Sequence, residues 1–459
     1  MAERLIVVGG DAAGMAAASQ ARRRRDRDDL EIVAFERGNF TSYSACGIPY
    51  WVSGVVPDRE QLIARDPATF RESFDIDIRI RHEVTGIDVE RREVVARDLA
   101  DGREVREGFD TLVYATGAVP VQPPWARTDA AGVFGVQTLD DGAALLDWLE
   151  REPRPRRAVV IGGGYIGVEM AEALIQRGLT VDLVEQSDQP MSTVDGDMGE
   201  LVADALKGIG IQIRTGLSVT GLEERDGRIA TVVTAEGPMP ADVVILGLGV
   251  RPNTALAEAA GLPLGPTGGL RTDRRMRVPG VPGVWAAGDC VETLHRISGM
   301  PVHVPLGTHA NKQGRVAGIN IGGGYATFPG VIGTAVTKVC DLEVGRTGLR
   351  ERDARAAGFD FVSVVAESTN RAGYYPGARR MTVKLIAERP SGRLLGAQIV
   401  GWSEAAKRID TLAVALWNSM TVDDMTALDL GYAPPYAPVW DPVLIAARKA
   451  VDALAGAGR

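Results

Sequence analysis

The chain has 459 residues, of which 45% are apolar and 24% charged, as is ordinary for a soluble globular protein, and this length predicts about three domains. A net charge of −9 argues against a nucleic-acid-binding surface. The sequence contains no run near the roughly 20 apolar residues of a membrane span and no signal-peptide core, so we expect a cytoplasmic protein. The three cysteines and four histidines form no ligand cluster, which predicts neither a metal site nor a disulfide framework.

The first fifty residues predict a dinucleotide-binding fold. A short apolar run over 4–9, typical of a buried parallel strand, leads into the turn Gly9-Gly10-Asp11-Ala12-Ala13-Gly14 and an Ala-rich helix. Such a turn holds a pyrophosphate at the helix N-terminus, although Asp11 replaces the middle glycine of G-x-G-x-x-G. The next predicted strand, 31–36, ends in Glu36, which is placed to accept hydrogen bonds from a ribose.

A run of four arginines, 22–25, follows on the same predicted helix, with Arg27 close by. Such a run is either a solvated helix face or an anion site for a phosphorylated ligand. The residues alone leave both interpretations open.

The stretch Ser42-Tyr43-Ser44-Ala45-Cys46-Gly47-Ile48-Pro49-Tyr50 contains a lone cysteine before a Gly-Ile-Pro turn. Because proline suits the first turn of a helix, we expect Cys46 near a helix N-terminus, which favours the thiolate. A thiolate attacks disulfide sulfurs. The alternative is a small residue that packs in a core.

A second dinucleotide fold is predicted further along the chain. A strand over 157–161 precedes Gly162-Gly163-Gly164-Tyr165-Ile166-Gly167, which matches G-x-G-x-x-G in full, and a helix to about residue 177 and a strand over 180–185 follow. Glu185 lies about 20 residues after Gly164, where an acid bonds the adenosine ribose. Because a carboxylate there repels a 2′-phosphate, NADH is favoured over NADPH.

Two more glycine turns end apolar runs, at 112–117 and 283–289. Asp289 follows Gly288 at a predicted strand end, where a carboxylate can bond sugar-like hydroxyls, whereas Cys290 is expected to pack without a role.

From about residue 325 the composition shifts and no Gly-rich fingerprint appears. Strands are predicted over 331–339, 380–386 and 393–400, and a helix over 405–416, which indicates a third domain of α+β type. The aromatic, proline-rich run over 431–440 needs a surface to pack on, and we expect a partner subunit there.

Over essentially its whole length the chain resembles the flavin disulfide reductases with two dinucleotide folds. Within them it resembles the single-cysteine branch, which includes coenzyme A (CoA) disulfide reductases, NAD(P)H sulfur or persulfide reductases, NADH oxidases and NADH peroxidases. The segments that carry the resemblance are Ser42–Tyr50, Ala310–Arg315, Tyr374–Gly377 and Tyr432–Tyr436. The run Gly333–Lys338 looks most like the CoA disulfide and sulfur reductases.

The resemblance implies an α/β protein with two Rossmann-like domains and a C-terminal α+β dimerisation domain. The expected bounds are 1–119 with 252–324 for FAD, 120–251 for NAD(H), and 325–459 for dimerisation. It implies FAD, NADH in preference to NADPH, and CoA as substrate or bound thiol. It also implies a homodimer whose site is completed by the partner subunit, with no membrane or nucleic-acid partner.

The resemblance implies the site residues as well. Catalysis is expected from Cys46, Tyr374 and Tyr432, the two tyrosines reaching the cysteine of the other subunit. FAD is expected at Gly9, Gly10, Ala12, Ala13, Gly14, Glu36, Arg37, Ser42, Cys46, Thr116, Gly117, Gly288, Asp289, Pro305 and Ala310. NAD is expected at Gly162, Gly164, Tyr165, Ile166, Gly167, Glu185 and Gly249, and CoA at Ser19, Gln20, Arg22, Arg23 and Ser42.

The chain also departs from its relatives. Thr41 and Trp51 stand where two-cysteine relatives carry a second cysteine, and no histidine follows His309, so the usual C-terminal His-Glu pair is missing. Ala12 replaces the histidine of the peroxidases, which disfavours peroxide reduction. We expect no rhodanese-like domain after residue 459.

The sequence therefore predicts that hydride passes from NADH through FAD to Cys46, which reduces CoA disulfide or a CoA persulfide or polysulfide. A tyrosine hydroxyl is expected to donate to the departing thiolate. One alternative is an NADH oxidase in which Cys46 cycles through a sulfenic acid. The other is a slow redox-sensing flavoprotein. Phosphate recognition by Arg22 and Arg23 separates reductase from oxidase, since oxygen carries no phosphate.

Overall fold

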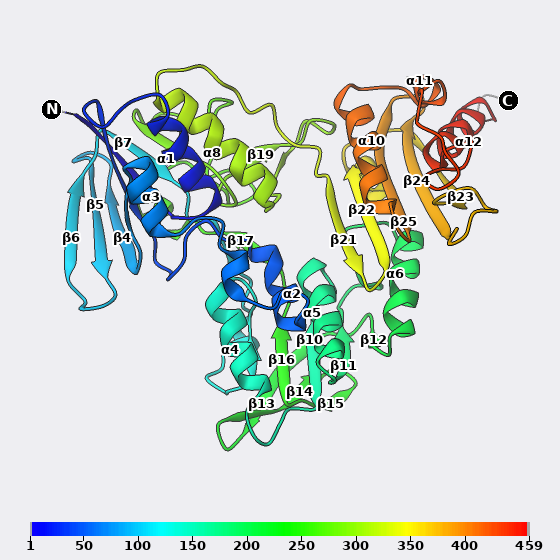
Figure 1. Ribbon diagram of the computed structural model, residues 1–459, viewed down its shortest axis with the longest axis horizontal. Coiled ribbons are helices and arrows are strands. Elements are labelled where there is room, and N and C mark those ends of the chain that lie inside the picture. The colour runs from blue at the N-terminus through cyan, green and yellow to red at the C-terminus, as the bar shows by residue number, and fades with distance from the viewer. Residues whose placement is uncertain (1, 457–459) are drawn as a thin grey trace.

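The computed structural model describes residues 2–456, in which three units are seen (Figure 1). The first is built on a parallel five-stranded sheet of order β18-β7-β1-β2-β3. Its strands are β1 (Glu3–Val8), β2 (Leu30–Phe35), β3 (Asp77–Arg79), β7 (Thr111–Tyr114) and β18 (Val284–Ala286). Residues far apart in the chain, 3–114 and 284–286, thus share one sheet.

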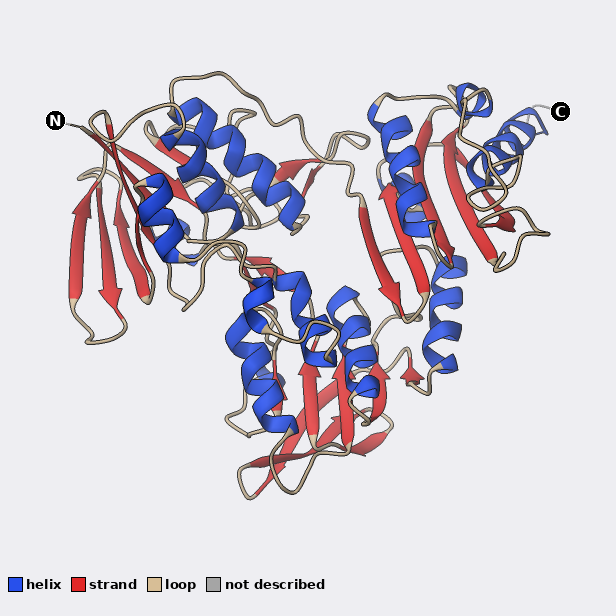
Figure 2. Cartoon of the chain, viewed as in Figure 1, coloured by secondary structure: helices blue, strands red, loops and turns tan. Residues whose placement is uncertain are grey.

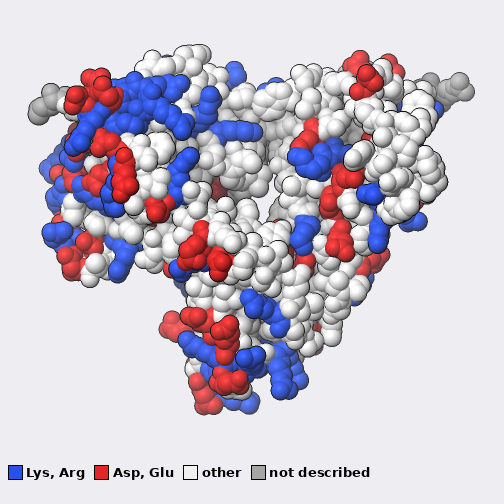
Figure 3. Space-filling view, viewed as in Figure 1, with Lys and Arg blue, Asp and Glu red and all other residues white. Residues whose placement is uncertain are grey.

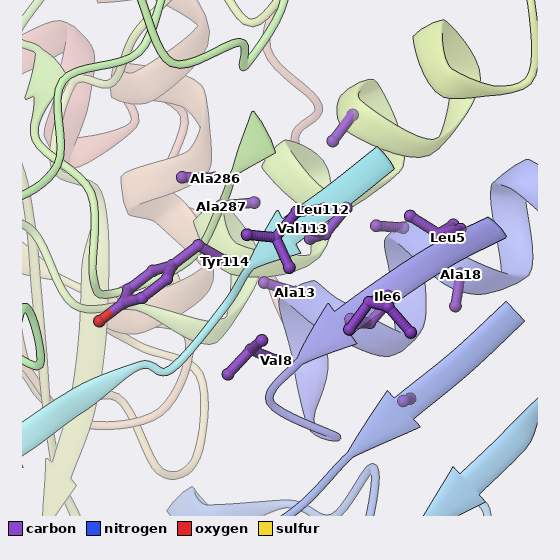
Figure 4. Packing of buried hydrophobic residues seen from close by; sticks show 14 of the residues in the cluster. Leu5, Ile6, Val8, Ala13, Ala18, Leu112, Val113, Tyr114, Ala286 and Ala287 are labelled. Carbon is purple, nitrogen blue, oxygen red and sulfur yellow. The ribbon is translucent and has the colours of Figure 1, made fainter. Parts of the chain in front are cut away.

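Helix α1 (Ala12–Arg22) packs between this sheet and α8 (Gly307–Ile321). Its small residues allow close approach, and Figure 4 shows Ala13 and Ala18 among strand residues such as Leu5 and Val113. The helix ends at Arg22, so the prediction that the whole arginine run is helical is wrong.

The second unit repeats the arrangement with a parallel sheet of order β12-β11-β10-β16-β9. Its strands are β9 (Val133–Phe134), β10 (Arg157–Ile161), β11 (Thr180–Val184), β12 (Gln212–Arg214) and β16 (Val243–Leu246), and its helices are α4 (Leu139–Leu149), α5 (Tyr165–Gln176) and α6 (Gly196–Gly208). An antiparallel pair, β8 (Ala118–Pro120) with β17 (Val250–Pro252), joins the first two units.

Two antiparallel three-stranded sheets accompany these folds, and the sequence analysis did not predict them. One contains β4 (His82–Asp88), β5 (Glu93–Asp98) and β6 (Glu104–Gly108), and the other β13 (Val219–Arg225), β14 (Arg228–Thr234) and β15 (Gly237–Pro240). The shorter elements are η1 (Ala45–Gly47), α2 (Ile48–Ser53), η2 (Arg59–Leu62), α3 (Pro67–Phe74), η3 (Pro124–Ala126), α7 (Ala255–Ala259), β19 (Thr293–Leu294) and β20 (Pro301–Val302).

The third unit is an antiparallel sheet of order β21-β22-β25-β24-β23 with helices beside it (Figure 2). Its strands are β21 (Ala335–Val339), β22 (Leu342–Gly348), β23 (Phe361–Thr369), β24 (Arg380–Glu388) and β25 (Leu394–Gly401), and its helices are α9 (Glu351–Ala356), α10 (Ala405–Trp417), α11 (Val422–Thr426) and α12 (Pro442–Gly456). The strand predicted over 331–339 begins only at Ala335, and β22 and β23 were not predicted.

A buried cation links the second and third units. Lys384 of β24 is almost fully buried, and its Nζ lies 2.8 Å from carboxylate oxygens of both Asp197 and Glu351 and 3.4 Å from Asp195. Burial tends to raise the pKa of Glu351, but hydrogen bonds from Lys384 and Arg355 hold this pKa at about 2. These charges fix α6 against the third sheet.

The predicted fold class is confirmed: two Rossmann-like units and a C-terminal α+β unit. The domain bounds stay a prediction, and residues 1 and 457–459 of those ranges lie outside the described residues. Among residues 2–456, none of the helices combines the length and the apolar character needed to cross a membrane.

Candidate active site

The predicted FAD residues gather at one edge of the first sheet. The Gly9–Gly14 turn follows β1, Glu36 and Arg37 follow β2, Thr116 and Gly117 follow β7, and Gly288 and Asp289 follow β18, while Pro305 and Ala310 lie at the start of α8. Because these strands are parallel, their carboxyl ends meet, and open α/β sheets bind ligands at that edge.

Glycines are required in the first turn because the backbone packs against itself there. Gly9 has φ +111°, and a Cβ there would collide with the carbonyl of Ala115; a Cβ on Gly14 would collide with the carbonyl of Gly9. Glu36 accepts hydrogen bonds from the backbone N–H of Gly10 at 2.8 Å, which sets the acid beside the turn.

The second turn repeats this geometry. A Cβ on Gly162 would collide with the carbonyl of Gly247, and one on Gly167 with the carbonyl of Gly162. Glu185 accepts from the N–H of Gly163 at 2.6 Å, as Glu36 does from Gly10. The two folds are therefore equivalent in detail, and each fits a dinucleotide.

Three carboxyl groups crowd the first site. Burial alone raises the pKa of Asp289 to about 6. Burial and then the charge of Glu36 raise the pKa of Asp11 to about 6, and Asp289 adds to this. Buried carboxyl groups need donors, and the hydroxyls of the FAD ribityl chain and ribose are donors, so the residues present fit that cofactor.

Cys46 lies at the junction of the two folds. It is exposed and stands in η1, directly before α2, whose Ile48 and Val52 are buried in the core of the second unit. Although the residue as a whole is exposed, the protein packed beside it desolvates the thiol, and this effect, followed by the charges of Glu169 and Asp289, raises the pKa of Cys46. One of these carboxylates comes from each dinucleotide fold, so the cysteine lies between them.

The raised pKa corrects one prediction. We expected a helix N-terminus to favour the thiolate, but Cys46 precedes a helix of only six residues and faces two carboxylates. The protein groups around the sulfur therefore disfavour the thiolate. The Ser42–Tyr50 motif contains neither Glu169 nor Asp289, so the sequence did not indicate their effect.

Glu169 is a site residue that the sequence analysis missed. It lies on α5, burial raises its pKa, and the hydroxyl of Thr337 donates to its Oε1 at 2.6 Å. A small pocket beside it is lined by Tyr50 and Lys338 among others. The only sequence signal was its position four residues after Tyr165 on the fingerprint helix.

The structure brings Tyr374 and Tyr432 together. Interaction with the side chain of Tyr432 raises the pKa of Tyr374, and the N–H of Ala372 donates to the carbonyl of Pro434 at 3.1 Å, so the two segments lie side by side. Both tyrosines are exposed. They belong to the third unit, at the right of Figure 1, whereas α2 beside Cys46 lies at the centre, so one chain does not bring them to its own cysteine.

The arginine run divides into structural and free residues. The three nitrogens of the Arg22 guanidinium donate to the carbonyls of Phe74, Arg25 and Asp75 at 3.1, 3.2 and 3.1 Å. Arg24 donates to Gln20 at 3.0 Å, and Arg25 pairs with Glu3. Of the predicted CoA residues, Ser19 is buried in the helix packing, and Arg23 is exposed.

Arg23 forms part of a surface that we call the Phe74 platform, made of Arg23, Arg65 and Phe74. The guanidinium carbons of Arg23 and Arg65 lie 5.9 and 5.4 Å from the centroid of the Phe74 ring. Both arginines are exposed, and Figure 3 shows basic side chains gathered at the upper left, over α1 and α3. Two cations beside an aromatic ring suit a nucleotide with phosphates. Arg65 and Phe74 were not predicted, because they lie far from the run in sequence.

Comparison with known proteins identifies the family. The family model "Pyridine nucleotide-disulphide oxidoreductase" matches residues 3–314, and the model for the dimerisation domain of the same family matches residues 334–442. The chain belongs to the pyridine nucleotide-disulphide oxidoreductase family. It is therefore an oxidoreductase that depends on FAD and NAD(P)H, and its third unit is a dimerisation domain.

Individual relatives resemble the chain over nearly its whole length. It is 38% identical to a "NAD(P)H sulfur oxidoreductase (CoA-dependent)" of Pyrococcus furiosus, over 97% of this chain and 98% of that protein. It is 35% identical to an "NADH oxidase" of Methanocaldococcus jannaschii, over 98% and 99%. Among solved structures it is similar to a NAD-dependent persulfide reductase from A. fulgidus, with a TM-score of 0.95 and 40% identity over 99% of this chain and 84% of that one.

Proposed function

We propose that this protein is an NADH-dependent reductase of CoA disulfide or of a CoA persulfide or polysulfide, acting through Cys46. The observation that carries the proposal is one exposed thiol at the junction of two dinucleotide folds. The other cysteines do not compete, because Cys290 is fully buried with its sulfur against the carbonyl of Ala287, and Cys340 lies in a hairpin turn.

We assign FAD to the first fold and NADH to the second. The FAD residues are Gly9, Gly10, Ala12, Ala13, Gly14, Glu36, Arg37, Ser42, Cys46, Thr116, Gly117, Gly288, Asp289, Pro305 and Ala310. The NADH residues are Gly162, Gly164, Tyr165, Ile166, Gly167, Glu185 and Gly249. This assignment is supported by the turn glycines, at which a Cβ would collide with a backbone carbonyl. It is also supported by Glu36 and Glu185, each of which accepts a hydrogen bond from the N–H of its turn.

The chemistry at sulfur follows from the lone cysteine. FAD bound in the first fold supplies the two-electron transfer from NADH that regenerates the Cys46 thiolate. The thiolate Sγ attacks one sulfur of CoA disulfide, the S–S bond breaks, and one CoA departs as a thiolate and takes a proton. Cys46 is left in a mixed disulfide with the second CoA, which takes the place of a second protein cysteine. The two electrons that come from NADH then break this S–S bond, so the second CoA leaves as a thiolate and the Cys46 thiolate is restored.

We assign the proton of the departing thiolate to a tyrosine of the partner subunit, Tyr374 or Tyr432. The family has a dimerisation domain, and these two exposed, paired tyrosines lie on it away from the cysteine of their own chain. A homodimer that exchanges these segments completes two equal sites.

The nucleotide end of CoA is assigned to the Phe74 platform, and Gln20 and Ser42 are assigned as further CoA contacts. Of the predicted residues, Arg23 is free to bind phosphate, whereas Arg22 is held by backbone carbonyls. The assignment of Ser19, like the cytoplasmic location and the absence of a nucleic-acid partner, stays a prediction.

A second candidate, NADH oxidase, is favoured by the same exposed cysteine, which oxygen chemistry can convert to a sulfenic acid. Anaerobic NADH oxidation with CoA disulfide, compared with oxygen uptake in its absence, separates the two. We expect fast anaerobic turnover that Cys46→Ser abolishes while FAD stays bound. The proposal is contradicted if Cys46→Ser reduces CoA disulfide at a near-normal rate. It is also contradicted if the wild-type enzyme oxidises NADH only when oxygen is present.

A further inference from the structure

The two segments that carry the tyrosine pair are loops on the dimerisation domain. One connects β23 to β24 and holds Tyr374, and the other lies between α11 and α12 and holds Tyr432. The exposed fractions of the two side chains are 77% and 49%, so core packing does not fix them. The backbone hydrogen bond from Ala372 to Pro434 joins the two loops at one point, and a tyrosine that donates a proton needs a defined position, so further contacts that fix the loops matter.

Arg408 of α10 donates hydrogen bonds to backbone carbonyls of both loops. Its Nη2 donates to the carbonyl of Asn370, where the first loop begins, at 3.0 Å, and to the carbonyl of Tyr436, in the second loop, at 2.8 Å. Its Nε donates to Oδ2 of Asp441 at 2.9 Å. One guanidinium therefore joins the first loop, the second loop and the start of α12.

The surroundings of Arg408 are built for this role. Its side chain is only 11% exposed, as is that of Asp441, whose Oδ1 also accepts from the N–H of Val443. Glu404 lies on the same side, 3.5 Å from Arg408 and 3.4 Å from Arg371 of the first loop. Asn370 is fully buried and closes its loop through bonds to Arg379.

We infer that Arg408 is a positioning residue for the reductase reaction, holding Tyr374 and Tyr432 in register so that they can act on the partner's cysteine. This inference rests on the proposed function. The guanidinium fork suits the role because its donors point in fixed directions toward several acceptors at once, which the single ammonium group of lysine does not.

The test compares Arg408→Met with a matched control on the same helix, Lys407→Met. Lys407 is 85% exposed and pairs with Asp410, and among the described residues it makes no hydrogen bond or ion pair to either loop. With CoA disulfide under anaerobic conditions we expect Arg408→Met to lose about tenfold to a hundredfold in kcat, the scale of a misplaced proton donor, and Lys407→Met to match wild type. Arg408→Lys should fall between them, and it serves as the test variant if Arg408→Met does not fold.

Two readouts separate positioning from general damage. First, Arg408→Met added to Tyr374→Phe/Tyr432→Phe should cost less than about threefold more, because residues that act through one another are not additive. Second, heterodimers of Arg408→Met with Cys46→Ser subunits should regain activity, because one site then combines an intact cysteine with an intact tyrosine pair.

The outcomes are distinguishable. Normal turnover by Tyr374→Phe/Tyr432→Phe overturns the tyrosine assignment and this inference with it. A defective tyrosine variant beside a normal Arg408 variant overturns the inference alone. Losses that multiply in the combined variant, or heterodimers without activity, show instead that Arg408 supports only the fold.

Discussion

Arg22 and Arg23 are neighbours in sequence, but the structure gives them different tasks, and replacing each by alanine should separate stability from substrate binding. Arg22→Ala removes three hydrogen bonds to backbone carbonyls from a side chain that is 11% exposed. Charge-assisted bonds contribute about 1.5–3 kcal/mol each, but the effects of removing them together overlap, so we expect a loss of about 2–4 kcal/mol in the free energy of unfolding. The KM for CoA disulfide should scarcely change.

Arg23→Ala should have the opposite profile. Arg23 is exposed and makes its ring contact at 5.9 Å, so its loss leaves no buried group unpaired and the unfolding free energy should stay near wild type. Solvent screens an exposed contact to phosphate, so we expect KM for CoA disulfide to rise about three- to tenfold. Turnover of a small uncharged disulfide should not change.

The assay pairs urea unfolding with steady-state kinetics on both variants, with Arg91→Ala as the control, since Arg91 is 82% exposed between β4 and β5 and takes no part in the Phe74 platform. A rise in KM for Arg22→Ala equal to that for Arg23→Ala would refute the division. Wild-type kinetics for Arg23→Ala with CoA disulfide would mean that the Phe74 platform is a solvated face, and the oxidase candidate would gain.

Three further predictions concern cofactor choice, acidity and stability. Glu185 should make kcat/KM at least about tenfold higher with NADH than with NADPH, a difference of about 1.4 kcal/mol, and equal values would count against the assignment of the second fold. Glu169→Gln removes a charge that raises the pKa of Cys46, so the rate at which Cys46 of the reduced enzyme is alkylated should rise at a lower pH than in wild type. An unshifted pH profile would show that Glu169 does not act on the Cys46 thiol. Lys384→Met leaves three carboxylates without their cation and should destabilise the protein by about 3–5 kcal/mol in urea unfolding, whereas a wild-type midpoint would show that the cluster contributes little.

The parts of the fold that the sequence predicted are those with a local signature. Gly162–Gly167 and Glu185 lie within one strand-helix-strand unit, so their spacing alone places them, and the first fold was recognised despite Asp11. Strands β4 and β13 were missed because their burial patterns lack the alternation that marks a strand with one buried face, whereas β6 alternates but has only five residues.

The site was predictable in its residue types more than in its electrostatics. Cys46 and the tyrosines were predicted through motifs, and their roles stay a prediction, while the structure brings the segments of Tyr374 and Tyr432 side by side. The pKa of Cys46 was predicted in the wrong direction because burial raises it first and the charges of Glu169 and Asp289 add to this, and no local pattern shows the burial or connects these acids to the cysteine. In the same way, Arg22 is held by the carbonyls of residues 74 and 75, which only the folded chain brings near.

The most direct test of the proposed chemistry is the mass of the protein after reduced enzyme has reacted once with CoA disulfide and no further NADH is present. Wild-type enzyme is reduced with NADH, and the excess nucleotide is removed under anaerobic conditions. The enzyme is then mixed with CoA disulfide in a buffer that contains no nucleotide, and the masses of the intact protein and of its peptides are measured. We expect the peptide that contains Cys46 to gain the mass of one CoA less two hydrogens, as a mixed disulfide requires, and Cys46→Ser to gain no adduct. A Cys46 peptide that never carries CoA but gains a single oxygen on exposure to air would contradict the account and establish the oxidase chemistry instead.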